Sequence, residues 1–283
     1  AGYAGYLAAL AGFTLLFWQG YNIMMDVWGV TARNVQRAPA WVQLLVSGSP
    51  SLAAVIQNLL VVLTSALIWR AFERDRLLRP ILTGRGTAKE IGWGALVGLA
   101  AMLLTAIILL ASDSSRLGWR LTSPRLSAMT GALAAISLAA AAGEEVFCRG
   151  FVMGMTMRRT NRPTGYVASM AVYALMHGTG EGATALSIVN WLLMGLACAL
   201  MYDLTGRIAM GLGFRFAWIY IAQAIAGFPG GDNAIYEIYS SSRYWMNGGD
   251  AGPMHGALVG LTLLAICAAL WLTLTRARTR GTS

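Results

Sequence analysis

Two adjacent carboxylates and an arginine stand in the middle of an apolar stretch. Residues 135–155 read AISLAAAAGEEVFCRGFVMGM and contain Glu144, Glu145 and Arg149. In a helix, Glu145 and Arg149 share a face and can pair, while Glu144 is turned by ~100° and can face another helix. A carboxylate that meets water inside a low-dielectric site can act as a general base. The alternative is a structural ion pair that fixes helix packing.

Two more polar residues are predicted at the same depth. His177 lies 12 residues from Gly165 and Asn190 lies 14 residues from Leu204. At ~1.5 Å per residue they lie ~18 and ~21 Å from one membrane edge, and Glu144 is also ~21 Å deep. Charge inside a bilayer costs about 2.5–3.5 kcal/mol per residue, so these groups on three helices predict a buried polar site. His255 is shallower, and we expect it in a loop or at a helix start.

The elements that must position these side chains are transmembrane helices. Of 283 residues, 57% are apolar and 12% are charged, which excludes a soluble enzyme, a disordered chain and a secreted disulfide scaffold. The sequence therefore predicts an all-α, polytopic membrane helical bundle that forms a single domain over 1–283. About eight transmembrane helices are expected, roughly at 4–26, 49–69, 92–112, 126–157, 165–178, 184–204, 208–226 and 253–275.

The net charge of +9 follows the membrane topology and does not indicate nucleic-acid binding. Basic residues concentrate in the loops on one side of the expected helices, which predicts an integral membrane protein, in a bacterial-type plasma membrane, with both termini cytoplasmic. These residues are Arg70, Arg74, Arg76, Arg79, Arg85, Lys89, Arg158, Arg159, Arg162, Arg207, Arg276, Arg278 and Arg280. Membrane lipid is one expected partner.

The remaining candidate ligands do not suggest a cofactor. Cys148, Cys198 and Cys267 lie in apolar segments without paired spacing, so we expect packing residues. With only two histidines, a three-histidine zinc site is impossible, and we predict no metal. Small residues four apart, such as Gly94 and Gly98, favour close helix packing.

The polar residues resemble the motifs of the CPBP intramembrane proteases, also called the CAAX-protease/bacteriocin-processing or Abi family. Its E-E-x-x-x-R motif is similar to the run from Glu144 to Arg149, and its aromatic-x-x-x-His motif to Tyr173 and His177. The stretch NWLLMGLACALMYDLTGRIAMGLGFRFAW is similar to the sixth and seventh helices of the family. The resemblance covers about residues 125–262, which we expect to form the core.

The resemblance implies an intramembrane endopeptidase that cleaves a membrane-proximal peptide. Glu144 would activate the attacking water, Glu145 and Arg149 would support it, and His177 would position water or stabilise the oxyanion. The implied partner is a membrane-associated peptide or protein substrate, and the sequence does not distinguish a prenylated CaaX tail from a bacteriocin leader.

The third family motif departs from the pattern. GFRFAWIY aligned with G-x-H-F-A-W-N-x puts Arg215 at the histidine and Ile219 at the asparagine. Arginine cannot replace a neutral imidazole as an acceptor. Near Glu144 it would form an ion pair that weakens the base; otherwise it could stabilise an oxyanion or extend to the membrane edge. Asn190 and Arg215 are thus possible auxiliary residues.

Three functions remain open from the sequence. The first is a Glu-activated endopeptidase, and the second is a catalytically impaired member that acts as a membrane scaffold or regulator with a membrane-protein partner. The third is a small transporter, although the sequence lacks an inverted repeat. A direct ion pair between Arg215 and Glu144 would favour the second, whereas an open Glu144–His177 site with Arg215 turned away would favour the first.

Overall fold

The computed structural model divides the chain into two compact units, Ala1–Arg76 and Leu77–Ser283. In the first unit it describes residues 55, 58–63 and 65–67, which are helical, and in the second it describes residues 84–119, 124–178, 183–228 and 234–280. The predicted helix at 4–26 lies outside the described residues, and the one at 49–69 lies only partly inside them.

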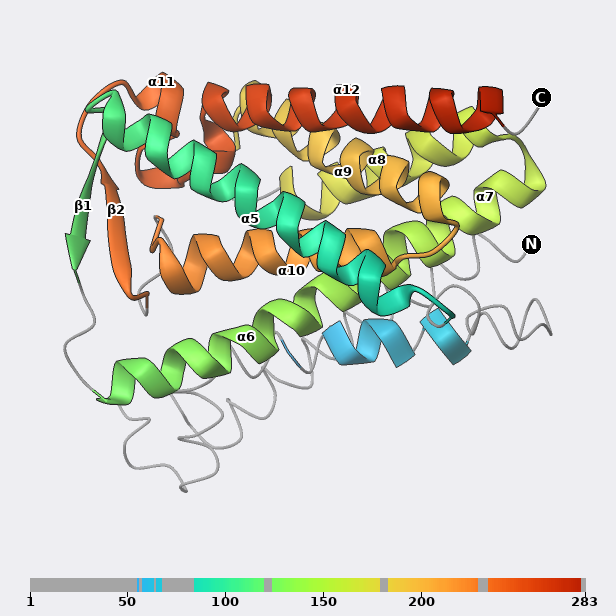
Figure 1. Ribbon diagram of the computed structural model, residues 1–283, viewed down its shortest axis with the longest axis horizontal. Coiled ribbons are helices and arrows are strands. Elements are labelled where there is room, and N and C mark those ends of the chain that lie inside the picture. Colours follow the sequence, from blue (N-terminus) through green and yellow to red (C-terminus); the bar gives the residue numbers. More distant parts are fainter. Residues whose placement is uncertain are drawn as a thin grey trace, which may run out of the picture. The chain divides into compact units, whose positions relative to one another are not determined.

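The described part of the second unit is helical apart from one two-stranded antiparallel sheet, which confirms the predicted helical class (Figure 1). The sheet was not predicted from the sequence. The elements are α5 (Thr87–Ala111), β1 (Ser115–Trp119), α6 (Pro124–Glu145), the π-helix η2 (Val146–Met153), α7 (Gly154–Arg159), α8 (Arg162–Gly178), α9 (Ala185–Thr205), α10 (Ala209–Tyr220), the π-helix η3 (Ile221–Ile225), β2 (Tyr236–Ser240), α11 (Tyr244–Asn247), the short 3-10 turns η4 (Gly249–Ala251) and η5 (Pro253–His255), and α12 (Ala257–Arg280).

Four helical runs within the described residues are long and apolar enough to cross a membrane: Thr87–Ala111, Thr130–Arg159, Ala185–Thr205 and Ala257–Thr279. They coincide with the predicted spans at 92–112, 126–157, 184–204 and 253–275. The predicted stretches at 165–178 and 208–226 are also helical but shorter, as α8 and as α10 with η3. The chain is thus an integral membrane helical protein, and the count of eight spans stays a prediction.

Helices α5 and α10 approach each other closely because glycines line their contact. A Cβ at Gly94 would collide with the carbonyl oxygen of Met210, and a Cβ at Gly213 would collide with the carbonyl oxygen of Ile91. Gly98 continues the same line, since a Cβ there would lie 2.6 Å from the carbonyl oxygen of Phe214. The small residues four apart on α5 therefore bring two backbones into contact.

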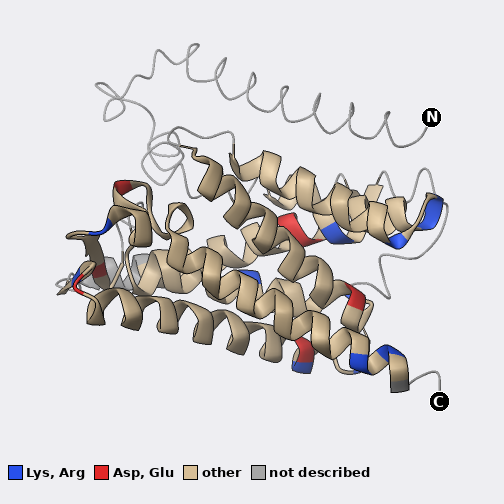
Figure 2. Ribbon diagram, turned by 90° about the horizontal axis from the view of Figure 1, so that it is seen from above, with Lys and Arg blue, Asp and Glu red and all other residues tan. Residues whose placement is uncertain are grey.

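Ion pairs join the elements at the end of the bundle where α12 ends. Asp203 at the end of α9 accepts hydrogen bonds from Tyr166 on α8 and Arg278 on α12, at 2.8 and 2.6 Å. In addition, Arg207 pairs with Glu90 at the start of α5. Basic residues gather around this end (Figure 2).

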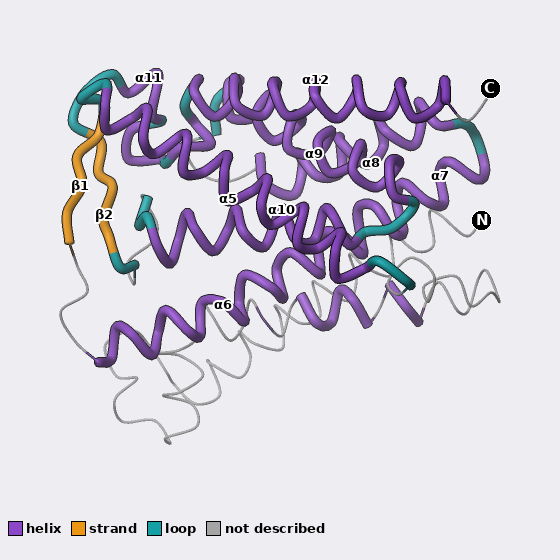
Figure 3. The backbone as a smooth tube through the Cα atoms, viewed as in Figure 1, coloured by secondary structure: helices purple, strands orange, loops and turns teal. Residues whose placement is uncertain are grey.

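The opposite end of the bundle carries the sheet and the short elements before α12 (Figure 3). Strand β1 pairs with β2 in antiparallel register, with Leu117 opposite Ile238. His255 ends the 3-10 turn η5, two residues before α12 begins, which agrees with the expected position in a loop or at a helix start. The cysteines are free and buried, as expected of packing residues.

Candidate functional site

Three helices supply the candidate site. Glu144 and Glu145 are the last residues of α6, His177 lies near the end of α8, and Arg215 lies in the middle of α10. After Glu145 the helix continues as the π-helix η2, which holds Arg149. π-helical segments inside longer helices are frequently found at functional sites.

Glu144 is in direct contact with His177 and with Arg215. Its Oε1 lies 3.3 Å from Nε2 of His177. Its Oε2 accepts from both Nε and Nη2 of Arg215, at 2.8 and 2.7 Å, and from the hydroxyl of Tyr173 at 3.2 Å. The structure therefore brings together Glu144, Tyr173, His177 and Arg215 from three parts of the sequence.

The donors around Glu144 occupy most of its accepting capacity. A carboxylate offers about four lone-pair directions, two on each oxygen. On Oε2 three donor atoms converge, while Oε1 has His177 as its partner among the described residues. One direction on Oε1 is thus left for a water molecule. The Glu144 side chain is 10% exposed and that of His177 is 20% exposed, so the pair is not sealed completely within the bundle.

The ring of His177 contacts two acceptors. Its Nδ1 lies 3.0 Å from the carbonyl oxygen of Tyr173, and its Nε2 faces the Glu144 carboxylate. A neutral imidazole has one N–H and can donate to only one of these groups. The tautomer of the ring decides which of the two groups accepts its proton.

Glu145 and Arg149 form a second, fully buried ion pair behind the first. Nη1 of Arg149 lies 2.8 Å from Oε1 of Glu145, and both side chains are 0% exposed. The other terminal nitrogen of Arg149 donates to the carbonyl oxygen of Gly195 on α9, at 3.0 Å. This pair has the i,i+4 spacing expected from the sequence. Its role, fixing η2 against α9, follows from the contact with Gly195.

Aromatic rings separate and support the two ion pairs. The buried Tyr173 ring lies 4.7 Å from the Arg149 guanidinium carbon and 5.5 Å from that of Arg215. Such cation–π contacts strengthen in a site that excludes water. On the other side, Trp191 stacks on His177 with ring centroids 4.4 Å apart. Trp191 was not predicted from the sequence, because an aromatic residue in an apolar helix gives no signal of its own.

Asn190 does not reach the Glu144 site. Its Nδ2 donates to the carbonyl oxygens of Met254 and Gly256, at 2.8 and 3.0 Å, and so ties α9 to the turn before α12. Ile219 is partly buried, one helical turn after Arg215 on α10. Among the described residues, no group of three His, Cys, Asp or Glu side chains could hold a metal ion.

The fold and the site together define a helical integral membrane protein with two buried carboxylate–guanidinium pairs and a histidine beside one of them. Residues 126–221 match the family described as type II CAAX prenyl endopeptidase Rce1-like. This segment, about a third of the chain, contains every residue of the two ion pairs and His177. The match confirms the resemblance predicted from the motifs and indicates a CAAX-protease-like function. Neither a curated protein nor a solved structure matches the chain.

Proposed function

We propose that this protein is a catalytically impaired member of the CAAX-protease-like class, acting as a membrane scaffold or regulator. In this role it binds a membrane-associated peptide or protein without hydrolysing it. The observation that carries the proposal is the 2.7 Å contact between Nη2 of Arg215 and Oε2 of Glu144.

The ion pair opposes general-base catalysis for an electrostatic reason. A base must accept a proton from water, and Glu144 would then lose its charge while Arg215 keeps its own. Leaving one member of a buried pair uncompensated costs about 3–5 kcal/mol. Because the Arg215 side chain is only 3% exposed, water cannot readily take over that compensation. A neutral histidine at position 215 would impose no such cost.

The second candidate function is a Glu-activated endopeptidase, and the contact between Glu144 and His177 favours it. In that reaction Oε1 of Glu144 takes a proton from a water molecule, whose oxygen attacks the peptide carbonyl carbon. The proton then passes to the amine when the C–N bond breaks. Arg215, which cannot accept a proton, would stabilise the negative oxygen of the tetrahedral intermediate.

A cleavage assay in proteoliposomes separates the two functions. The unmodified protein, Glu144→Gln, and the double variant Arg215→His with Ile219→Asn are compared on a fluorescent prenylated CaaX peptide. We expect no Glu144-dependent product from the unmodified protein, and a product from the double variant that disappears when Glu144→Gln is added. Arg276→Gln, at the exposed end of α12, is the matched control for loss of an arginine charge.

Glu144-dependent cleavage by the unmodified protein would overturn the first proposal and establish the second. Because the natural substrate class is open, the same variants are also tested on a membrane-anchored leader peptide. Binding of either peptide, measured by a change in its fluorescence anisotropy, is expected for the unmodified protein even without cleavage. Failure to bind either peptide would count against the scaffold role.

We also propose that the basic end of the bundle faces the cytoplasm and that both termini lie on that side. The exposed arginines Arg158, Arg159 and Arg276 support this orientation under the positive-inside rule. Cysteines introduced at position 276 and position 116 test it with a membrane-impermeant thiol reagent applied to intact cells. Labelling at position 116 but not at position 276 is expected. The opposite result would show that the basic end faces outward and would contradict the proposed orientation.

A further inference from the structure

The sheet at the end of the bundle opposite the basic end is amphipathic. Paired residues in an antiparallel sheet point to the same face, and successive residues alternate between faces. Leu117 pairs with Ile238 and Trp119 with Tyr236, so these four apolar or aromatic side chains share one face. The other face carries Arg116, Glu237 and Tyr239.

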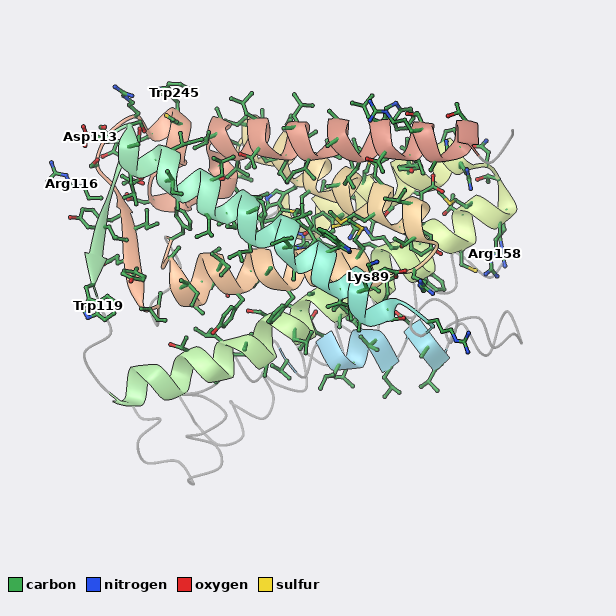
Figure 4. All side chains as sticks on the ribbon, in the orientation of Figure 1. Lys89, Asp113, Arg116, Trp119, Arg158 and Trp245 are labelled. Atoms are coloured by element: carbon green, nitrogen blue, oxygen red, sulfur yellow. The ribbon has the colours of Figure 1, made fainter. Side chains whose placement is uncertain are left out.

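The helices of the bundle cover only part of the apolar face of the sheet. Ile238 is 4% exposed, so this face is turned toward the interior of the bundle. On the same face, however, Leu117 is 51% exposed and Trp119 is 59% exposed. Figure 4 shows Trp119 at the far end of β1 from α5, and its ring meets that of Tyr236 edge-on, with the centroids 5.0 Å apart. This part of the apolar face therefore needs a cover other than the described helices.

The helices set the level of the sheet relative to a bilayer. The apolar run of α5 from Ile91 to Ala111 is ~30 Å long, which equals the thickness of the hydrocarbon core. β1 begins four residues after α5 ends, and the polar turn Ser112–Ser114 lies between them. The sheet thus lies at the level where hydrocarbon gives way to lipid headgroups.

The unpaired backbone edge of β1 also indicates that the sheet lies outside the hydrocarbon core. Among the described residues β1 pairs with no strand other than β2, so its outer edge has no partner strand. Such an edge does not occur inside the hydrocarbon region, because unsatisfied N–H and C=O groups cost several kcal/mol there. Trp245 on α11, 68% exposed, adds a second indole at this end. Tryptophan is enriched where one side of the ring meets hydrocarbon and the other meets water.

We propose that β1 and β2 form an interfacial lipid-binding element. Its apolar face, Leu117 and Trp119, inserts at the boundary between headgroups and acyl chains in the leaflet opposite the basic end. Its polar face, with Arg116 and Glu237, stays in water. The ligand class is the lipid surface itself, and the element is separate from the Glu144 site.

Depth-dependent quenching of tryptophan fluorescence tests this proposal on the full chain. The protein is reconstituted into vesicles of phosphatidylcholine and phosphatidylglycerol with bromine either near the headgroup or near the end of the acyl chain. The emission of Trp119→Phe is subtracted from that of the unmodified protein to isolate one indole. We expect this component to be quenched more by shallow bromine than by deep bromine. Trp191→Phe, which removes an indole stacked on His177, is the control. The Trp191 component, isolated by the same subtraction, should be quenched less by shallow bromine than the Trp119 component.

Quenching of the Trp119 component by aqueous iodide and by neither bromolipid would overturn the proposal, because the sheet would then stand in water. Strongest quenching by deep bromine would overturn it as well. A second pair of variants places a charge on each face. Leu117→Asp should shift the Trp119 emission to longer wavelength and abolish its shallow quenching, whereas Tyr239→Asp, on the polar face, should leave both unchanged. Equal effects of the two substitutions would contradict the assigned faces, and helical content by circular dichroism shows that both variants fold.

Discussion

Arg215 and Glu144 are direct partners, with Nη2 of the arginine 2.7 Å from Oε2 of the glutamate. Arg215, which the sequence resemblance aligns with the histidine of the third motif, thus pairs with the glutamate that the resemblance aligns with the first motif. Since both side chains are buried or nearly so, the pair is a structural element as well as an electrostatic restraint. Its energetic role can be measured without a substrate.

Removing one member of this pair should destabilise the protein, whereas removing both should not. Arg215→Leu leaves a buried carboxylate without its guanidinium, and we expect a loss of about 3–5 kcal/mol in the free energy of unfolding. Glu144→Leu combined with Arg215→Leu should recover most of that loss, because no uncompensated charge remains. Unfolding in mixed detergent micelles, followed by circular dichroism, gives both values. A single variant as stable as the unmodified protein would show that the pair contributes no coupling energy.

Arg149 should be less replaceable than its charge alone suggests. Its two terminal nitrogens donate to Glu145 and to the carbonyl oxygen of Gly195. Lysine carries the same charge but lacks the planar fork that reaches both acceptors. We therefore expect Arg149→Lys and Arg149→Met both to lower the midpoint of thermal unfolding, with lysine the milder change. Arg276→Gln at the exposed end of α12 is the control, and an Arg149→Lys variant with unchanged stability would refute the two-acceptor role.

The contact between α5 and α10 predicts a sharp difference between two neighbouring glycines. Gly94→Ala would force its Cβ into the carbonyl oxygen of Met210, so the helices must separate. A Cβ at Gly92 meets nothing within 4 Å. Gly92→Ala should therefore be neutral or stabilising by up to about 1 kcal/mol, the helix propensity difference. Thermal unfolding of the two variants checks this, and similar midpoints would rule out the close approach.

Asn190 is expected to act on stability and not on catalysis. Asn190→Ala would remove both hydrogen bonds to the carbonyl oxygens of Met254 and Gly256, which leaves buried acceptors unsatisfied at about 1–3 kcal/mol each. In the background of Arg215→His with Ile219→Asn, the same change should leave the turnover per folded molecule unaltered. A selective loss of turnover with normal stability would instead restore Asn190 as an auxiliary residue of the site.

The layer of polar residues was predictable because helix geometry converts sequence separation into depth. Equal depth brought Glu144 and His177 into contact, as the structure shows. Equal depth gives no information on direction around the helix axis, however. Asn190 therefore faces α12 instead of the Glu144 site. For the same reason, the sequence left three orientations open for Arg215, and only the arrangement of α10 against α6 selects the ion pair.

The sheet and the aromatic support could not be predicted from the sequence. β1 and β2 are five residues each and are separated by more than a hundred residues, so no local sequence pattern predicts their pairing. Likewise, the stacking of Trp191 on His177 depends on how α8 and α9 pack. The long apolar helices were predictable because a run of about twenty apolar residues is the length that a helix needs to cross the hydrocarbon core of a membrane. The total of eight spans could not be checked in the same way, since 4–26 lies outside the described residues.

The glycine contacts between α5 and α10 have a mechanical consequence for the Glu144 site. Because the two backbones are in contact at Gly94 and Gly213, a sliding or rotation of α10 against α5 would have to break this close packing. The helix that carries Arg215 is thus the more firmly packed side of the site. The opposite wall is α8, whose His177 is partly exposed. If a peptide binds beside Glu144 as proposed, we expect it to displace α8 or to turn the Arg215 side chain. A disulfide engineered between α8 and α9 would block the first route and leave the second open.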